Sequence, residues 1–340
     1  MGRSAGAIAA GATSVGTFAG FNGAGVYATA IGAGPTGFNG ARAHGNYSIA
    51  IGGGDGAGET AGSWAPGVLS IAIGSASIAT GVRTVAVGPF AGTNAGAGNH
   101  RNSSFGSEAG RFVTGAGNIA AGLAAGHTVD GDLNSALGNT AGQLVTGNNN
   151  TAGGVLAGVT VSGDSNAAYG DNAGRDVNGS GNVAIGLRAG RNINASYTVA
   201  VGTAARATAH NAVAIGRGAS ATNPRAVALG YGSVATMADT VSVGSNALRR
   251  RIVNVAAGIK PTDAVNLAQA QALLSAGTAS LPSTGGADSA KRLIDGIRQE
   301  LSDLRALVQR QQALLARQQD EIAELKGRKA AAAHAAPDTN

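Results

Sequence analysis

Residues 199–216 read VAVGTAARATAHNAVAIG, and the four-residue phrase at the start of this stretch returns at its end. The phrase occurs as VAVG at 199–202, VAIG at 213–216, VALG at 227–230 and VSVG at 241–244, with a spacing of 14 residues each time. Such a unit is too short for two packed helices. Because branched aliphatic and small residues alternate in the phrase, the pattern is typical of a β-strand.

A second repeat, 16 residues long, precedes these units. A glycine recurs at this spacing from Gly106 to Gly202, an asparagine from Asn102 to Asn182, and an aliphatic residue from Val113 to Ile193. Since these columns keep the same phase, the unit reads approximately N-x-A-x-G-x-x-A-G-x-x-V-x-G-x-x. Repetition at a fixed short period indicates a solenoid.

The first 100 residues carry the same phrase at uneven spacing, as IAIG at 49–52 and 71–74 and as VAVG at 85–88. Insertions into a repeat usually form loops on one face. We expect these loops to hold most of the aromatic residues, namely Phe18, Phe21, Tyr27, Phe38, Tyr47 and Trp64.

Two short strands and two tight turns use about 14 residues, which predicts one turn of a narrow β-solenoid, stacked at about 4.8 Å per turn. We expect Val213 and Ile215 to point into this turn and Ala214 to point outward. The glycine columns are expected to provide positive φ or close backbone approach. The asparagine column is expected to hydrogen-bond the turn backbone. We further expect the outward alanine face to pack against the same face of other copies of the chain.

Composition narrows the possible functions. Glycine accounts for 57 of 340 residues and aromatic residues for only 4%, which is too few for the core of a typical enzyme domain. There is no cysteine, so disulfides, zinc–thiolate sites and cysteine nucleophiles are excluded. Neither paired histidines at metal-binding spacing nor a phosphate-binding loop occurs. We therefore expect no enzymatic activity, no cofactor and no metal, with calcium at Asp130 and Asp132 as a weaker alternative to solvated turns.

The pattern changes at residue 245. The stretch SNALRRRIVNVAAGIKPTDAVNLAQAQALL, at 245–274, combines a basic triplet, a short apolar piece, a turn and a helix, with Thr262 expected as the helix N-cap and Asp263 in its first turn. Residues 275–287 have the composition of a flexible linker. Residues 327–340 show no packing pattern and are expected to be mobile.

Between linker and tail, residues 288–326 carry a heptad pattern. One seam position is filled by Ile294, Leu301, Val308, Leu315 and Ile322, and the other by Ala290, Ile297, Leu304, Gln311, Gln318 and Leu325. Apolar residues at alternating spacings of three and four predict a coiled coil. Gln311 and Gln318 are expected to help set its register, whereas the mixture of seam residues leaves the number of strands open.

Two stretches resemble a known family. NAVAIGRGAS at 211–220 is similar to the head repeat of YadA-like trimeric autotransporter adhesins, and RRRIVNVAAGIKPTDAVNLAQ at 249–269 is similar to their neck. The resemblance covers most of residues 45–326. It implies a homotrimer with a left-handed parallel β-roll head and a neck that adapts a wide head to a narrow stalk.

The two ends of the chain differ from what the resemblance implies. Members of the family normally begin with a long signal peptide and end in a membrane-anchoring β-barrel segment. The first 16 residues make a poor signal peptide, and no strand pattern precedes residues 338–340. We expect either a fragment or a head, neck and stalk used in another setting, without membrane insertion by this chain.

The expected fold is thus an all-β solenoid, a trimeric left-handed parallel β-roll head, followed by a neck and a C-terminal α-helical coiled coil. Its expected parts are irregular head repeats (1–100), 16-residue repeats (101–197), 14-residue repeats (198–246), neck (247–274), linker (275–287), coiled-coil stalk (288–326) and tail (327–340).

The expected function is that of a non-enzymatic adhesin on the bacterial surface, which binds an extracellular matrix protein or a cell-surface glycan through the repeated head. Nucleic acid is not an expected partner. A phage tail fibre, located on the virion tail, is the main alternative. An ice-binding solenoid is a third, disfavoured because no threonine column runs through residues 102–197.

Candidate residues follow from the basic character of the head and neck, since arginines suit an acidic ligand. The candidate ligand-binding residues are Arg206, Asn211, Arg217 and Arg225, and the candidate neck residues are Arg249, Arg250, Arg251, Asn254, Asp263 and Asn266. We expect Asp263, from its own or a neighbouring chain, to compensate part of the charge of the arginine triplet. The alternative is that these arginines face solvent.

Overall fold

The computed structural model describes residues 6, 9–35, 40–54, 61–96, 98–279 and 286–334. These residues form two compact units. The first unit extends to Arg251, and the second starts at Ile252.

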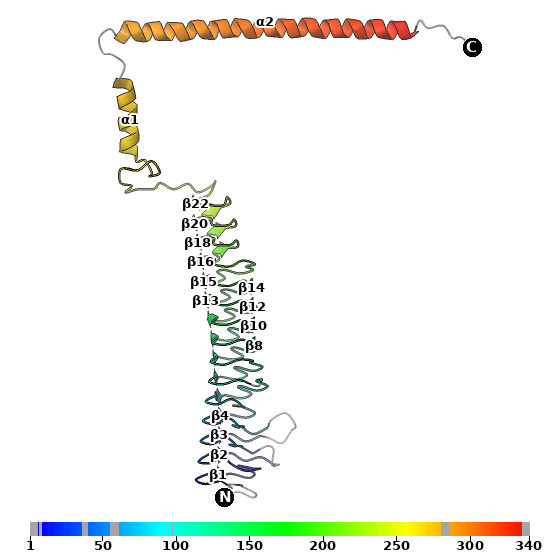
Figure 1. Cartoon of the computed structure of the whole chain (residues 1–340), viewed down its shortest axis with the longest axis vertical. Helices are drawn as coiled ribbons and strands as arrows, with labels where there is room; N and C mark the ends of the chain where they lie inside the picture. Colours follow the sequence, from blue (N-terminus) through cyan, green and yellow to red (C-terminus); the bar gives the residue numbers. More distant parts are fainter. Residues whose placement is uncertain are drawn as a thin grey trace, which may run out of the picture. The chain divides into compact units, whose positions relative to one another are not determined.

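The first unit is a β-solenoid built around one long parallel sheet of 15 strands, stacked along its axis (Figure 1). Each turn of the solenoid, called a coil below, contributes one strand, and equivalent residues pair from coil to coil, as Val199, Val213 and Val227 do. In order along the long sheet, the strands are β1 (Thr13–Val15), β2 (Thr29–Ile31), β3 (Ile49–Ile51), β4 (Ile71–Ile73), β5 (Val85–Val87), β6 (Ser103–Phe105), β7 (Ile119–Ala121), β9 (Ser135–Leu137), β11 (Thr151–Gly153), β13 (Ala167–Tyr169), β15 (Val183–Ile185), β16 (Val199–Val201), β18 (Val213–Ile215), β20 (Val227–Leu229) and β22 (Val241–Ser242).

A second, shorter strand completes each regular coil, as the repeat length predicted. These strands form two separate side sheets, each running parallel from coil to coil. The 16-residue coils provide β8 (Val129–Asp130), β10 (Val145–Thr146), β12 (Val161–Ser162) and β14 (Val177–Asn178). The 14-residue coils provide β17 (Arg206–Ala207), β19 (Ser220–Ala221) and β21 (Val234–Ala235).

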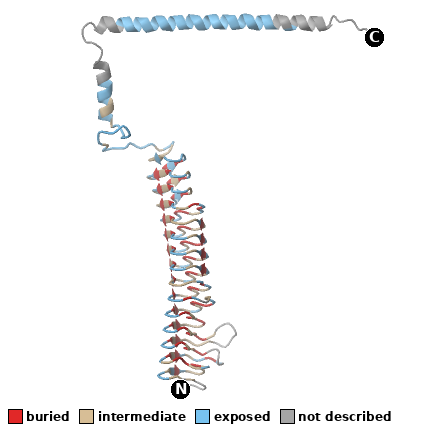
Figure 2. Cartoon of the chain, in the orientation of Figure 1, coloured by how far each residue is buried: buried red, intermediate tan, exposed pale blue. Residues whose placement is uncertain are grey.

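The inward side of the long sheet is alanine, which corrects the expected orientation of the strands. Ala214 is completely buried, Val213 is half-buried, and Ile215 is 39% exposed. The physical reason is the width of the coil, because backbone faces backbone at a distance that only a methyl group fills. In each 14-residue coil the core consists of alanines, such as Ala214, Ala219, Ala221 and Ala226. Buried residues accordingly run as a thin band along the inside of the head (Figure 2).

The 16-residue coils have a wider core in which valine and asparagine join alanine. The valine column, from Val113 to Ile193, is buried against itself from coil to coil. Glycine is required beside it: Gly142 has φ of 59°, and a Cβ there would lie 2.8 Å from the Cβ of Ala136. The predicted roles of the glycine columns are confirmed.

The asparagine column forms a buried hydrogen-bonded ladder. The backbone N–H of Asn166 donates to Oδ1 of Asn150 at 3.0 Å, and Nδ2 of Asn150 donates to the carbonyl of Gly163 at 2.9 Å. The same pattern links Asn102, Asn118, Asn134, Asn150, Asn166 and Asn182, and it ends where Thr198 donates to Asn182. Each side chain therefore satisfies polar groups of two neighbouring coils.

Most of the early aromatic residues belong to regular turns, which corrects the expectation that insertion loops hold them. Tyr27 and Tyr47 occupy the position just before a strand of the long sheet, and their rings stack at 5.4 Å. Trp64 pairs with Arg42 and Ile78 through isolated parallel bridges. Such positions point outward and accept bulky side chains, whatever the length of the coil. Phe38 lies outside the described residues.

The second unit contains α1 (Leu267–Ala279) and α2 (Gly286–His334). Helix α1 includes 275–279, which were expected as linker, and α2 continues through 327–334, which were expected as a mobile tail. The second difference arises because alanine, arginine and lysine, which dominate 327–334, favour helix even without a packing pattern. Residues 280–285 and 335–340 lie outside the described residues. Of the helices that the structure describes, neither has the length and hydropathy needed to cross a membrane.

The asparagine ladder generates a stability prediction. Substitution Asn150→Ala leaves the N–H of Asn166 and the carbonyl of Gly163 without their buried partner. We expect the free energy of unfolding to fall by about 1–3 kcal/mol, the cost of an unsatisfied buried polar group. Denaturant unfolding measures this change. Thr146→Ala, an exposed substitution on β10, is the control, and an equal effect of both substitutions contradicts a structural role for the ladder.

Candidate functional site

The four candidate ligand-binding residues are all exposed, but they lie on different edges of the coil. Arg206 lies on the side strand β17. Arg217 lies in the trailing turn, defined here as the turn directly after a strand of the long sheet. Asn211 and Arg225 lie in the leading turn, directly before such a strand. The structure therefore distributes these residues around the head and does not gather them into one site.

Arg225 is engaged by the next coil. Its Nη2 donates to Oδ2 of Asp239 at 2.7 Å, and Asp239 occupies the same leading-turn position 14 residues later. The hydrogen bond and charge of Arg225 lower the pKa of the Asp239 carboxyl, and the same carboxylate raises the pKa of Arg225. The pair links two coils at the surface and offsets the charge that Arg225 was expected to offer to a ligand.

Arg217 and Asn211 also make local contacts. The Arg217 guanidinium lies 4.8 Å from the centre of the Tyr231 ring, one coil further along the trailing turn. A cation over an aromatic face is attracted by the ring quadrupole. Asn211 has φ of 58°, a left-handed conformation that asparagine adopts more readily than most residues. The turn geometry accounts for Asn211 without any ligand.

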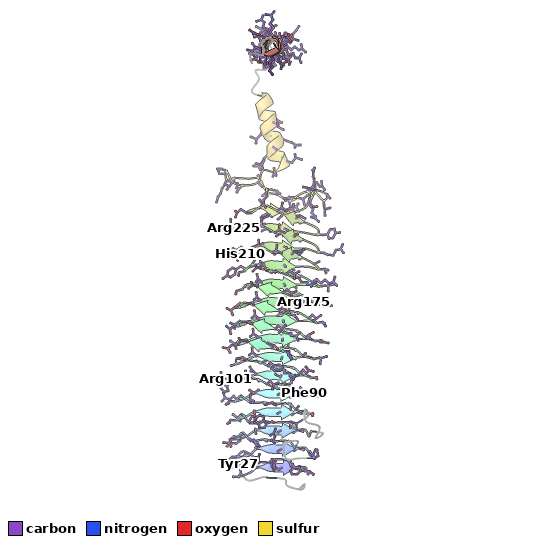
Figure 3. All side chains as sticks on the ribbon, turned by 90° about the vertical axis from the view of Figure 1, so that its right-hand side faces the viewer. Tyr27, Phe90, Arg101, Arg175, His210 and Arg225 are labelled. Atoms are coloured by element: carbon purple, nitrogen blue, oxygen red, sulfur yellow. The ribbon has the colours of Figure 1, made fainter. Side chains whose placement is uncertain are left out.

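Figure 3 places Tyr27, Arg101 and Arg225 along one long edge of the head and Phe90 along the other. The first edge is the leading turn, where tyrosine, arginine, asparagine and aspartate occur in different coils, together with leucine, serine and glycine. The second edge is the trailing turn. Both edges repeat with every coil, so the head offers two long rows of exposed side chains.

The arginine triplet at 249–251 has divided roles. Arg250 closes the end of the solenoid by donating to the carbonyls of Tyr231 and Val243 and to the hydroxyl of Ser233. Within the described part of the chain, neither it nor Arg249 or Arg251 forms an ion pair.

Asp263 bonds to backbone groups of its own turn. Its Oδ2 accepts the N–H groups of Lys260 and Ile259, both at 2.9 Å, and these bonds lower its pKa. Asp263 thus closes the turn after Gly258. Charge compensation of the arginine triplet by Asp263 stays a prediction.

Asn266, and not Thr262, is the N-cap of α1. The N–H of Gln269 donates to Oδ1 of Asn266 at 3.0 Å, and the N–H of Asn266 reaches back to Oε1 of Gln269 at 3.3 Å. This reciprocal arrangement is a capping box. Asn266 also donates to the carbonyl of Val255, which ties the neck segment to the helix. Asn254 has φ of 60°, a positive value that asparagine tolerates.

The acidic turn residues have a backbone role. Oδ1 of Asp132 accepts the N–H of Ala116, and Oδ1 of Asp164 accepts the N–H of Asn148, each from the preceding coil at 2.7 Å. Among the described residues, no group of three or more histidine or acidic side chains is placed to hold a metal ion. These carboxylates therefore link neighbouring coils by hydrogen bonds to the backbone.

A hollow of about 340 Å³ on the trailing side of the head was missed by the sequence reasoning. It lies between Trp64 and Phe90, with Arg42 and Arg111 at its border. The one available signal was Trp64, the only tryptophan of the chain. Trp64 pairs with Arg42 across coils of unequal length, so residue spacing in the sequence does not predict this pairing.

Comparison with protein families supports the resemblance found in the sequence. The family model for the YadA head domain repeat matches residues 39–54, 65–91, 194–219 and 221–247. These stretches contain coils in which alanine lies between two aliphatic residues of the long sheet. The resemblance to YadA-like adhesins is confirmed at the level of the head repeats.

Among solved structures, the collagen-binding domain of the Yersinia adhesin YadA is similar to this chain, with 27% identity and a TM-score of 0.29. The match covers 67% of this chain and 97% of that domain. No curated protein matches the chain.

The Arg225–Asp239 pair generates a pH prediction. Because the folded pKa of Asp239 is lowered, the contribution of the pair to stability is present above the unfolded value of about 3.9 and is lost as pH falls through the folded value. A carboxyl NMR titration of Asp239 should give a midpoint below the ordinary pKa of an aspartate. Arg225→Gln should return the midpoint toward that value. An unchanged midpoint in the variant contradicts the pairing.

Proposed function

We propose that the chain is a non-enzymatic adhesin of the bacterial surface, and that its head binds host extracellular matrix or cell surfaces. The observation that carries this proposal is the set of four stretches that match the YadA head repeat. The described side chains fit a binding role, since they form long rows of exposed groups. Extracellular location and adhesion both follow from the family resemblance.

The outward face of the long sheet supports assembly with further copies of the chain. This face carries many apolar side chains at the first and third residues of its strands, each 39–69% exposed: Val15, Ile31, Phe105, Ile119, Leu137, Tyr169, Ile185, Ile215, Leu229 and Val241. Contiguous apolar patches of this extent mark interaction surfaces. The expected packing of alanine faces is replaced by packing of aliphatic and aromatic side chains.

Helix α2 leaves a comparable stripe uncovered. Its seam residues Ile294, Leu301, Val308, Leu315 and Ile322 are 46–59% exposed in the single chain. Seam residues at heptad spacing become buried when helices supercoil. Copies of the chain in parallel register would cover both stripes at once. The number three, the left-handed sense of the β-roll and the coiled-coil stalk rest on the resemblance and remain predictions.

Recognition is proposed to be spread over the repeated surface. Equivalent side chains recur at about 4.8 Å from coil to coil, and three chains multiply their number. Weak contacts then reinforce one another through effective concentration. The 14-residue coils are the favoured region, because they combine the family repeat with Arg206, Arg217 and Arg225.

Assembly is tested by analytical ultracentrifugation. We expect the intact chain to sediment with about three times the monomer mass of 32.7 kDa. Ile185→Arg places a charge on the apolar face and should dissociate the assembly or weaken it strongly. Leu187→Arg is the matched control, because Leu187 is similarly exposed, 45% against 42%, but lies in the trailing turn. A stable wild-type monomer contradicts the proposed trimer.

Adhesion is tested with the full chain on immobilised matrix proteins, collagen among them, and on host cells. Deletion of one 14-residue coil should retain the fold and reduce binding gradually. Replacement of Arg206, Arg217 and Arg225 by serine should weaken binding to an acidic ligand and flatten its salt dependence. Loss of all binding through one substitution contradicts distributed recognition. Adsorption to bacterial cells in place of host material would favour the tail-fibre alternative.

A further inference from the structure

The trailing side of the head carries a hollow lined by two aromatic side chains, formed where two columns of side chains change in size. Arg42, Trp64 and Ile78 succeed one another in one column, and Gly92 follows them, so the column ends abruptly. In the neighbouring trailing-turn column, Ala76 precedes Phe90, whose backbone N–H reaches the coil of Ser75. Ala61, Gly62 and Ala76 therefore leave a hollow that Trp64 and Phe90 also line.

Two arginines border this hollow. The Arg42 guanidinium lies 5.2 Å from the centre of the Trp64 ring and is about half-buried. Arg111 lies 5.9 Å from the Phe90 ring and 4.9 Å from the Phe112 ring. Guanidinium groups keep their charge at neutral pH. Partial burial strengthens their attraction for an anion, because the local dielectric is lower than in water.

Arg111 is only weakly neutralised. Its Nη1 lies 3.6 Å from Oε2 of Glu108, which is an ion pair without a hydrogen bond. Its Nε is buried and has no hydrogen-bond partner among the described residues. Arg111 therefore retains capacity for an anion. Asn94, at the rim, adds an exposed amide that both donates and accepts hydrogen bonds.

The hollow also has the size and position of a ligand site. Its volume of about 340 Å³ falls within the range of small-molecule pockets. Its walls belong to the trailing turn and the side column and not to the outward face of the long sheet. Association of chains through that face would therefore leave it open. Figure 3 places Phe90 on the edge opposite the leading-turn residues.

We propose that this hollow, between Trp64 and Phe90 and bordered by Arg42 and Arg111, binds one acidic sugar unit of a cell-surface glycan. The aromatic faces accept the apolar C–H face of a pyranose ring, since their negative faces attract C–H groups. The Arg111 guanidinium pairs with a carboxylate or sulfate, for which its planar fork is suited, and the charge of Arg42 at the border adds to the attraction. This inference rests on the proposed adhesive function for its ligand source, and it adds a defined site to the distributed surface.

The test fills the hollow without altering the fold. Ala76 has φ of 54°, and Leu156 and Phe90 occupy equivalent trailing-turn positions with φ of 55° and 59°. The backbone conformation at this position is therefore compatible with a bulky residue, and because Ala76 is 6% exposed and lines the hollow, the ring of Ala76→Phe should occupy and block it. Ala124→Phe, at the equivalent position with φ of 51° and in a coil remote from the hollow, is the matched control.

The binding measurement is calorimetric titration of the full chain with a heparin-derived disaccharide, sialyllactose and neutral lactose. We expect at least one acidic sugar to bind in a salt-dependent way and lactose to bind at least about tenfold more weakly, consistent with loss of one charged pairing. Ala76→Phe, Trp64→Ala and Arg111→Gln should each weaken binding by about tenfold or more. Ala124→Phe and Arg217→Gln, which alters the comparable stacking of Arg217 on Tyr231, should not.

The two acidic sugars distinguish a sulfate from a carboxylate as the recognised group. Absence of binding by both, or equal binding by wild type and Ala76→Phe, overturns the proposal. Binding of poly-glutamate alone, sensitive to Ala76→Phe, overturns the sugar assignment and favours an acidic peptide. Thermal unfolding of each variant identifies any loss of fold. If Trp64→Ala misfolds, the binding measured for Ala76→Phe decides whether the hollow is the site.

A parallel attachment assay separates this proposal from the proposed function. If wild type binds the acidic disaccharide but attaches to neither matrix nor host cells, the adhesive function fails and the sugar site stands. If Ala76→Phe loses disaccharide binding but keeps attachment, the site again stands, and attachment depends on the rest of the head.

Discussion

Stacking of each residue over its own equivalent in the next coil is the constraint on which the whole head depends. Every strand of the long sheet pairs in parallel with the strand one coil away, so any side chain meets a copy of its own column. The side chains at equivalent positions must therefore be compatible with one another at a spacing of about 4.8 Å. Alanine and valine do so by packing, asparagine does so by donating to one neighbour while accepting from another, and glycine does so where a Cβ would strike the next backbone.

The thin core has a consequence for assembly. A 14-residue coil, which admits only alanine methyl groups in its interior, must place its larger aliphatic residues outside, as Ala214 and Ile215 illustrate. The outward side chains are exposed in the single chain, and the proposed assembly would bury them against other copies. The heptad residues of α2 are likewise exposed within the described chain. The head and the helix thus offer two separate surfaces to the proposed assembly.

Much of this architecture could be predicted from spacing alone. The repeat length gave two strands per coil, and the glycine and asparagine columns identified the turns and the ladder, because both signals depend only on sequence separation. The orientation of VAIG could not be obtained in this way, since alternation has a period of two and does not state which phase faces inward. The width of the coil decides that, and width is a tertiary property. Likewise, Asn266 replaces Thr262 as the cap of α1 because Gln269 completes its capping box, and the hollow beside Trp64 depends on which columns end at which coil.

The central claim, that in-register columns of one chain are held parallel to those of two further copies through the long sheet, is tested most directly by distances between spin labels. The chain has no cysteine, so single substitutions Asp171→Cys, Leu187→Cys and Thr203→Cys each place one nitroxide per chain in the same trailing-turn column. Double electron–electron resonance should give one narrow inter-chain distance that is nearly the same at all three positions. Absence of dipolar coupling, or a distance that changes steadily from coil to coil, would contradict the account.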